Sequence, residues 1–360
     1  MLLAPPLAAC LDQLLGDPRR WPHPVQAMGG LIEALRSPLE GWAGDRPGRL
    51  RLAGMLITAG TVGASLTAGL GLERLAAWGW RQGPVLGLLT CLPLLLGLAS
   101  ALAGRSLQQA VLHVLELLPA NPGRDLEPAR RQLAWIVGRD TDQLAEPEIL
   151  RALAETASEN AVDGLFAPLF WMLVGSGLAL ASWGTTATAT EALSPLTQAW
   201  GLPLGPLSLA WGFKAASTLD SMLGYRRGRL RWLGTAGARL DDVLTWIPCR
   251  LVALTLPLAA GRPRQTWRLF CQSLEQGLPD PSPNAGVSQA AYALVARVRL
   301  GGVNHYGGES RAKPILAADQ PAADRAAVTR ILALSQRLLL LWLLIWLLGG
   351  TAFSAWRQLL

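Results

Sequence analysis

The sequence predicts an all-α protein, a polytopic bundle of membrane-spanning helices whose polar helical loops form a cap on the cytoplasmic side. Two observations predict this class. Hydrophobic residues make up 51% of the 360 residues and charged residues only 16%, whereas a soluble protein carries about 25% charged residues. Charge-free stretches of about 20 residues, enough to cross the hydrocarbon core as a helix, also alternate with basic segments. The alternative, buried helices of a large soluble core, explains these stretches less well.

Five stretches are candidate spans: 52–72, 83–104, 164–183, 196–212 and 338–353. All but two of the 32 basic residues are arginines, and they concentrate between these stretches. Such an excess of basic residues is typical of cytoplasmic loops. The pattern predicts one integral membrane domain over 1–360, multi-pass in the inner (cytoplasmic) membrane, with a site that faces the cytoplasm. The polar segments expected on that side are 105–163, 213–242 and 262–337.

The stretch 243–261 is apolar but contains Pro248, Arg250 and Pro257. Each proline removes a helical hydrogen bond, and an arginine at mid-bilayer costs about 2.5–3.5 kcal/mol on insertion scales. We therefore expect a broken, re-entrant or protein-buried segment rather than a simple span.

Several other classes of protein are disfavoured. The net charge of +7 comes from arginines beside the apolar stretches, so nucleic acid is not an expected partner. The four cysteines show no CxxC spacing and the three histidines lie far apart, which argues against a zinc site or a disulfide framework. The sequence has no P-loop, HExxH or GxSxG motif, so any nucleotide must bind to a less familiar architecture.

Four polar clusters accompany the candidate spans. The first is a loop rich in proline and glycine, in which Asp17 and His23 either contact a substrate or belong to a turn that ties the N-terminal helix to the bundle. The last cluster contains a Ser-Pro-Asn-Ala-Gly turn with Asn284, followed by Arg299 and pairs of glycines. Backbone amides at such a helix start favour anions.

The second cluster is the most informative. Arg139 and Asp140 lie in a turn, and the helix predicted after it carries a charged residue at every fourth position, on one face: Arg151, Glu155, Glu159 and Asp163. Arg151 and Glu155 can pair, but the three carboxylates cannot all be paired. Hard carboxylate oxygens at the membrane surface suit Mg²⁺ with a phosphate substrate. A solvated acidic helix face is the alternative, and Asn160, a poor helix former, favours the site.

The third cluster begins with Lys214, one of two lysines in the chain, at a predicted membrane boundary where snorkelling is the ordinary role of a lysine. The other polar residues of this cluster are Asp220, Ser221, Tyr225, Arg239, Asp241 and Asp242. The paired aspartates offer oxygens suited to a metal, and the arginine offers bidentate donors to phosphate or carboxylate.

In their order, four motifs resemble the adenosylcobinamide-phosphate synthase (cobinamide synthase) family of cobalamin biosynthesis, labelled CobD or CbiB. They are LDQLLGDP…WPHPVQAMG, GRDT…ETASENAVDG…APLFW, KAASTLDSMLGY…ARLDDVLTWIP and SPNAG…RLGG…YGG. The resemblance covers residues 8–315. Ser217 stands where the family has asparagine, and Gln289 stands where the family has an acidic residue.

The resemblance implies an amide-bond-forming ligase. Its reaction joins (adenosyl)cobyric acid, at a propionate carboxylate, to (R)-1-amino-2-propanol or its O-phosphate and gives (adenosyl)cobinamide or its phosphate. It implies ATP and Mg²⁺ as cofactors. The expected partners are the corrinoid, the aminopropanol compound, the lipid bilayer and other cobalamin-assembly enzymes at the membrane.

With this chemistry, we expect catalytic roles for Lys214, Arg239, Asp241 and Asp242. We expect metal ligation by Glu155, Glu159 and Asp163. The expected substrate-binding residues are Asp17, His23, Arg139, Asp140, Asn160, Asp220, Ser221, Tyr225, Asn284 and Arg299.

Two other functions stay open, a membrane transporter and a non-catalytic membrane sensor. A transporter predicts ionisable groups deep inside spans and a repeat symmetry. Here only Arg250 lies inside an apolar segment, and the acidic motifs lie at the boundaries of the spans.

Overall fold

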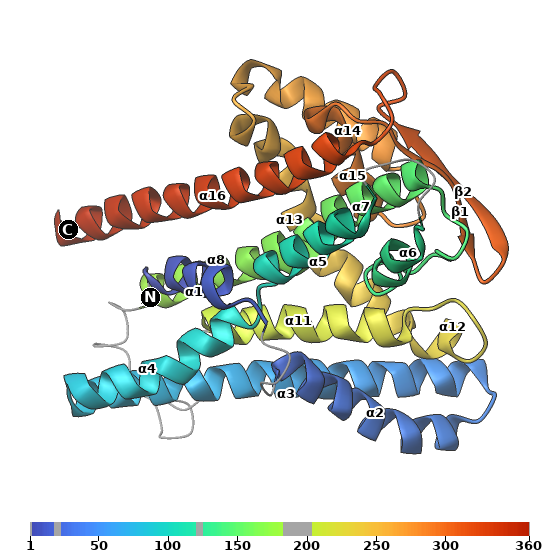
Figure 1. Ribbon diagram of the computed structural model, residues 1–360. Helices are drawn as coiled ribbons and strands as arrows, with labels where there is room; N and C mark the ends of the chain where they lie inside the picture. The colour runs from blue at the N-terminus through green and yellow to red at the C-terminus, as the bar shows by residue number, and fades with distance from the viewer. Residues whose placement is uncertain (1, 18–22, 120–124, 183–203, 360) are drawn as a thin grey trace. The chain divides into compact units, whose positions relative to one another are not determined.

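The computed structural model describes residues 2–17, 23–119, 125–182 and 204–359 (Figure 1). The chain forms two compact units. The first comprises Met1–Ala103, Ala167–Leu244 and Leu343–Leu360, and the second comprises Gly104–Phe166 and Thr245–Trp342. Each unit is therefore assembled from segments that are far apart in the sequence. The predicted helical class is confirmed for most of the chain.

The first unit consists of helices, several of which begin with a proline that sets the helical φ at a position where no amide donor is needed. They are α1 (Ala4–Leu15), α2 (Pro24–Ala43), α3 (Pro47–Gln82), α4 (Pro84–Ala99), α8 (Ala167–Ser182), α11 (Pro206–Leu223) and α12 (Leu230–Leu233), with the start of α13 (Thr235–Ala259) and the end of α16 (Arg325–Leu359). Helix α3 packs along both α4 and α11, and Figure 1 shows the three side by side.

The second unit combines helices with one hairpin. Its elements are α5 (Gly104–Leu117), α6 (Glu127–Leu133), α7 (Glu146–Ala161), the π-helical turn Val162–Phe166, the 3-10 turn Pro263–Gln265, α14 (Thr266–Gly277), α15 (Ala285–Ala296), β1 (Leu300–Tyr306) and β2 (Glu309–Leu316), with the rest of α13 and α16. The strands pair antiparallel and are joined by Gly307 and Gly308, both with positive φ. The expectation that 262–337 is entirely helical is therefore wrong, because a Gly-Gly pair favours a two-residue hairpin turn.

Within the described residues, four helices are long and apolar enough to cross a membrane, or five if α4 and α5 count as one bent span. The four are Pro47–Gln82, Glu146–Ala181, Thr235–Ala259 and Arg325–Trp356. They include the predicted spans 52–72 and 338–353 and most of 164–183. Of the predicted span 196–212, residues 196–203 lie outside the described part of the chain, and the remainder belongs to α11.

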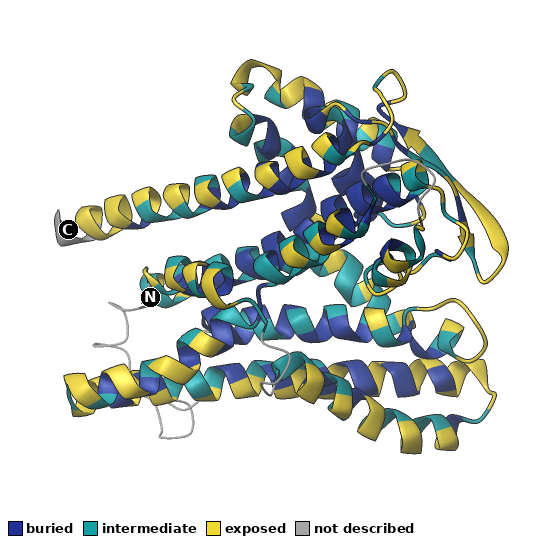
Figure 2. Ribbon diagram, in the orientation of Figure 1, coloured by how far each residue is buried: buried dark blue, intermediate teal, exposed yellow. Residues whose placement is uncertain are grey.

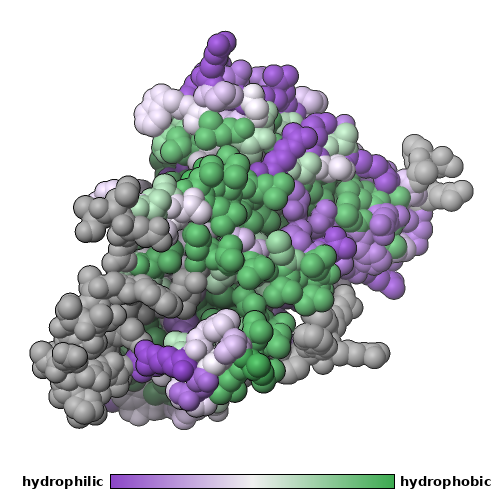
Figure 3. All heavy atoms as spheres, turned by 90° about the vertical axis from the view of Figure 1, so that its left-hand side faces the viewer, coloured by the Kyte–Doolittle hydropathy of each residue, from purple (hydrophilic) through white to green (hydrophobic). Residues whose placement is uncertain are grey.

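Large apolar side chains on these helices are exposed, as lipid-facing positions should be, because lipid is as apolar as the side chains themselves. Figure 2 shows exposed residues along α3, α4 and α16, and hydrophobic residues cover much of the face drawn in Figure 3. Examples on the three helices are Met55, Leu56, Leu88, Leu89, Leu92, Leu340, Leu344 and Ile345.

The segment 243–261 was expected to be broken, re-entrant or buried in protein, and residues 243–259 of it belong to one continuous helix, α13. A proline at position 248 removes the hydrogen bond to the carbonyl of Leu244. The indole nitrogen of Trp171 donates to that carbonyl at 3.0 Å, so the missing bond is replaced. Arg250 is satisfied too, since its guanidinium donates to the Asn284 side chain at 2.6 Å and to the Pro283 carbonyl at 2.8 Å. The helix tolerates both residues because neighbouring groups satisfy them.

A buried carboxylate fixes the start of α11 in the first unit. Glu73 on α3 accepts hydrogen bonds from the amides of Gly205 at 3.1 Å, Leu207 at 2.7 Å and Ser208 at 3.0 Å, and from the Ser208 hydroxyl at 2.8 Å. One turn earlier on α3, a Cβ built on Gly69 would lie 2.7 Å from the Ser208 Cα. The glycine permits close approach and the glutamate caps the incoming helix.

Candidate functional site

In the second unit, Glu155 on α7 lies at the centre of a buried ion network. Its side chain is 2% exposed and forms ion pairs with Arg139 and with Arg151, whose side chains are 9% and 11% exposed. The predicted pairing of Arg151 with Glu155 is confirmed, with an N–O distance of 2.9 Å. The amide of Gly301 also donates to Glu155 at 2.9 Å. Burial of this carboxylate is therefore matched by two cations and a backbone donor.

Strand β1 closes the network. The Asn304 side-chain oxygen accepts from Arg139 at 2.8 Å and from Arg151 at 3.0 Å. Arg151 also donates to the carbonyls of Gly301 and Val303, each at 3.0 Å. The network thus attaches the hairpin to α7. This is a structural role for Arg139, predicted to bind substrate, and for Glu155, predicted to ligate a metal.

Glu159, one turn further along α7, has different partners. It accepts from Gln289 on α15 at 2.7 Å, and Lys313 on β2, paired with Asp280 at 3.2 Å, lies near it. Burial alone would lower the pKa of Lys313, but the carboxylates of Glu159 and Asp280 raise it above its usual value, so the lysine stays protonated. The amide at position 289 can donate to Glu159, which a carboxylate there could do only when protonated.

A cavity of about 100 Å³ adjoins this group, lined by Ile136, Val137, Gly138, Arg139, Thr156, Glu159, Tyr306 and Lys313. Asp163 lies in the π-helical turn that follows α7. Across the described residues, no three His, Cys, Asp or Glu side chains are grouped so as to hold a metal ion. Within the stripe on α7, Glu155 is bound by two arginines and Glu159 by Gln289.

Asp140 and Asn284 anchor loops of the second unit. Asp140 accepts from the amides of Gly307 at 2.9 Å and Gly308 at 2.8 Å, at the tip of the hairpin. The hydrogen bond from the Gly308 amide, and to a lesser extent that from the Gly307 amide, lowers the pKa of Asp140 below its usual value. Asn284 is 5% exposed and accepts from Arg250.

In the first unit, α11 and α13 bring together four of the predicted residues. Lys214 and Asp220 lie on α11, and Asp241 and Asp242 lie on α13. Asp220, Asp242 and Lys214 are the charged neighbours that act on Asp241. Three of these residues, Lys214, Asp241 and Asp242, are ones that the sequence assigned to catalysis, and the fourth, Asp220, was assigned to substrate binding.

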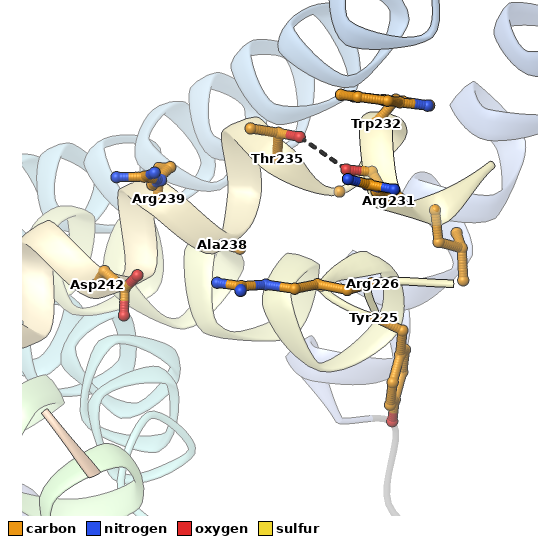
Figure 4. Close-up of a pocket in the computed structure, with 11 residues that line it drawn as sticks. Tyr225, Arg226, Arg231, Trp232, Thr235, Ala238, Arg239 and Asp242 are labelled. Atoms are coloured by element: carbon orange, nitrogen blue, oxygen red, sulfur yellow. Dashed lines mark hydrogen bonds between the residues drawn. The ribbon is translucent and has the colours of Figure 1, made fainter. Parts of the chain in front are cut away.

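A cavity of about 310 Å³ in the same unit is lined by two further members of the predicted set, Tyr225 and Arg239, together with Asp242 (Figure 4). Arg239 and Arg226 are the cations that act on Asp242. The residues that line the cavity are Gly224, Tyr225, Arg226, Leu230, Arg231, Trp232, Gly234, Thr235, Ala238, Arg239 and Asp242.

The remaining predicted residues have local partners. His23 and Asp17 are hydrogen-bonded to each other at 3.1 Å, and the His23 ring accepts from the amide of Val25 at the start of α2. These contacts match the turn that was one of the two readings of this loop.

Three others form hydrogen bonds within their own helix or to a neighbouring loop. Asn160 donates to the Thr156 hydroxyl at 2.8 Å, and Ser221 donates to the Ser217 carbonyl at 2.9 Å. The amide of Arg299 donates to the Pro321 carbonyl at 2.8 Å, and its side chain is exposed.

The structure adds residues that the sequence reasoning missed, namely Lys313, Asn304, Arg226, Arg231 and Trp232. Lys313 is the second of the two lysines, a signal that was available. In the sequence analysis, the arginines of residues 226–231 served only to predict that this segment lies on the cytoplasmic side.

These observations define a class: a mostly helical protein with four or five candidate membrane spans in its described residues and with buried and cavity-lining charged clusters. A sequence model described as CobD/CbiB protein matches residues 5–335. The chain belongs to the CobD/CbiB family of cobalamin biosynthesis, as the motifs predicted.

Three curated relatives show how far the similarity extends. The chain is 38% identical to the cobalamin biosynthesis protein CobD of Synechocystis over 348 residues, which covers 97% of this chain and 90% of the relative. It is 38% identical to CobD of Geobacter metallireducens, over 86% of this chain and 84% of the relative. It is 35% identical to CbiB of Salmonella typhimurium, over 87% and 86%. No solved structure matches the chain.

Proposed function

We propose that this protein catalyses ATP-dependent amide formation between (adenosyl)cobyric acid and (R)-1-amino-2-propanol or its O-phosphate. The product is (adenosyl)cobinamide or its phosphate. The observation that carries the proposal is membership of the CobD/CbiB family over residues 5–335. The relatives compared above are named as cobalamin biosynthesis proteins.

The chemistry requires a new bond between the amine nitrogen and the carboxylate carbon, and one carboxylate oxygen must leave. A phosphoryl donor such as ATP supplies the leaving group, because the oxygen then departs as phosphate. Lys214 and Arg239 are suited to stabilise negative charge on the phosphates. Asp241, with Asp220 and Asp242 as neighbours, is placed to accept the proton that the amine loses.

Mg²⁺ fits this cluster better than the acidic stripe on α7. Mg²⁺ in nucleotide sites is commonly held by one or two carboxylates together with substrate phosphates. Asp220 and Asp242 offer that number of ligands and leave Asp241 as the base, whereas Glu155 is enclosed by arginines. The proposal therefore moves the metal from the predicted stripe to the third cluster. We also propose that this cluster faces the cytoplasm, where ATP is available, from the inner membrane.

A reconstitution assay tests the reaction. Purified protein in detergent, incubated with adenosylcobyric acid, ATP-Mg²⁺ and either amine, should form the amide, detected by its mass. Asp241→Asn should reduce turnover about 100-fold or more, as expected for loss of a general base. Asp45→Asn is the matched control, because Asp45 is an exposed carboxylate that pairs with Arg229 at 2.7 Å outside the cluster.

A cell lacking the protein separates the ligase from a transporter. The deletion strain should accumulate cobyric acid and be rescued by cobinamide. If it still converts internally made cobyric acid to cobinamide, with no second homologous gene, the ligase proposal is wrong and a transporter becomes the leading function. If the deletion strain converts cobyric acid to cobinamide normally and only the expression of the pathway genes changes, the protein is a sensor instead.

A further inference from the structure

Helix α13 ends in a Schellman motif, after which the chain turns sharply into α14. Gly261 has a φ of 72°, its amide donates to the Leu258 carbonyl at 2.9 Å, and the Arg262 amide donates to the Pro257 carbonyl at 2.8 Å. A glycine in the left-handed conformation ends a helix in this way. Because α13 is one of the candidate membrane spans, the chain from Arg262 onward lies next to the end of a candidate span.

One face of α14 packs on α15. Leu269, Ser273 and Gly277 are buried, and their spacing of four places them on the same side of the helix. A Cβ built on Gly277 would lie 2.5 Å from the carbonyl oxygen of Gly286 on α15. Close backbone contact with α15 therefore accounts for this face.

A second face of α14 is apolar but is not buried by that contact. Five apolar residues at spacings of three and four form it, namely Trp267, Phe270, Cys271, Leu274 and Leu278. Trp267 is 68% exposed and Leu278 is 54% exposed, and the ring centroids of Trp267 and Phe270 lie 5.6 Å apart. We call these five residues the apolar strip. Such a strip with an exposed tryptophan is typical of a helix that lies in the membrane interface.

Positive charge accompanies the apolar strip. Arg262, Arg264 and Arg268 lie in this segment, whereas residues 260–277 contain one acidic residue, Glu275. Arg264 and Arg268 are exposed, and no ion pair joins either of them to a residue that the structure describes. Cations in such a position attract an anionic partner.

The end of α15 adds to this positive surface. Arg262 donates to the Val295 carbonyl at 3.2 Å, and Arg330 on α16 donates to the adjacent carbonyl of Ala296 at 3.3 Å. The exposed Arg297 follows, close enough to Arg262 for their charges to interact. Arginines from three parts of the second unit therefore gather near the turn that leads into α14.

We infer that α14 lies in the membrane interface and binds anionic phospholipid headgroups. The apolar strip enters the boundary between headgroups and acyl chains, while Arg264 and Arg268 contact the phosphates. A lipid surface supplies apolar contact and negative charge together, which the strip and the arginines require. Its place is also set by the chain, because Trp267 follows Ala259, the last residue of α13, by eight positions. The inference does not depend on the proposed amide formation.

The native Cys271 lies on the apolar strip and provides a probe of depth. In the full chain, Cys10 and Cys91 are replaced by serine, Cys249 is buried, and Cys271 carries an environment-sensitive fluorophore. In nanodiscs of phosphatidylcholine and phosphatidylglycerol, lipids brominated near the headgroup should quench the fluorophore, and aqueous iodide should not. Gln272→Cys, with Cys271 replaced by serine, is the matched control. The next residue of a helix points about 100° away, so this position should be quenched by iodide instead.

A second measurement tests the choice of headgroup. In the same mixture, bromine is carried either by phosphatidylglycerol alone or by phosphatidylcholine alone, and the ratio of the two quenching efficiencies reports enrichment of the anionic lipid at Cys271. Replacing both Arg264 and Arg268 by glutamine should lower this ratio by about two- to fivefold, since one arginine near an anionic surface contributes about fivefold in affinity. Arg311→Gln is the control and should leave the ratio unchanged, because Arg311 is an exposed arginine of the hairpin that pairs with Glu309 at 3.6 Å.

Three results would overturn the inference. Quenching of the Cys271 probe by iodide and not by brominated lipid would place the apolar strip in water. Shielding of the probe from both quenchers would mean that a protein surface covers the strip. An equal enrichment ratio in the wild type and in the double arginine variant would show that Arg264 and Arg268 do not bind anionic headgroups.

Discussion

Glu73 and Glu155 are both carboxylates buried in long helices, but the protein satisfies them by different means. Glu73 accepts from three backbone amides and a hydroxyl at the start of α11. Glu155 is paired with two guanidiniums that are themselves almost fully buried. The first charge is balanced by the partial positive charge of a helix N-terminus, the second by full cations.

This difference determines which groups lose a partner when each carboxylate is removed by mutation. Without Glu73, four neutral donors lose their acceptor. Without Glu155, two buried cations lose their counter-charge, which costs more than loss of neutral hydrogen bonds. The predictions below use this contrast, beginning with the largest expected effect.

Removal of the charge at Glu155 should destabilise the protein most. Glu155→Gln leaves Arg139 and Arg151 buried without their carboxylate, and we expect the free energy of unfolding to fall by about 3–5 kcal/mol. Denaturant unfolding in detergent micelles measures this. Glu148→Gln is the control, because Glu148 also pairs with Arg151 but its side chain is 45% exposed, so at most about 1 kcal/mol should be lost. Equal losses in the two variants would contradict the buried-network reading.

Removal of Glu73 should have a smaller effect, confined to the start of α11. Glu73→Ala should cost about 2–3 kcal/mol, since buried donors lose a charged acceptor, and Glu73→Gln should cost less because its carbonyl oxygen still accepts. Hydrogen exchange of the Leu207 and Ser208 amides should speed up in the alanine variant. Unchanged protection of these amides would mean that Glu73 does not cap α11.

The smallest effect concerns a third carboxylate, Asp140. Like Glu73 it accepts hydrogen bonds from backbone amides, but from two rather than three, and it lies at the exposed hairpin tip. Its folded pKa is lowered, so its contribution is complete above the pKa of the unfolded chain, near 4, and is lost as pH falls through the folded value. Protection factors of the Gly307 and Gly308 amides should therefore drop below about pH 4. In Asp140→Asn they should be low and independent of pH, and a wild-type drop that persists in this variant would show another titrating group.

Patterns within one helix or one loop were readable from the sequence. The charge-free stretches predicted α3 and α16, because a membrane span must be apolar along its whole length. The spacing of four predicted the pair of Arg151 and Glu155, because such residues lie one turn apart on a helix. The hairpin was missed although its Gly-Gly turn was visible, because the glycine pairs were noted without a turn being predicted from them.

By itself, the sequence determined the mostly helical class, the candidate membrane spans and membership of the CobD/CbiB family, because composition and ordered motifs are properties of the chain. Only the tertiary structure decided which charges meet. Arg139 and Asn304 are 165 positions apart, and Glu73 and Gly205 are 132 apart. It also decided that α13 is continuous, because Trp171 donates to the carbonyl that Pro248 leaves open. Such partners depend on how distant helices pack, and no periodicity along the chain encodes that.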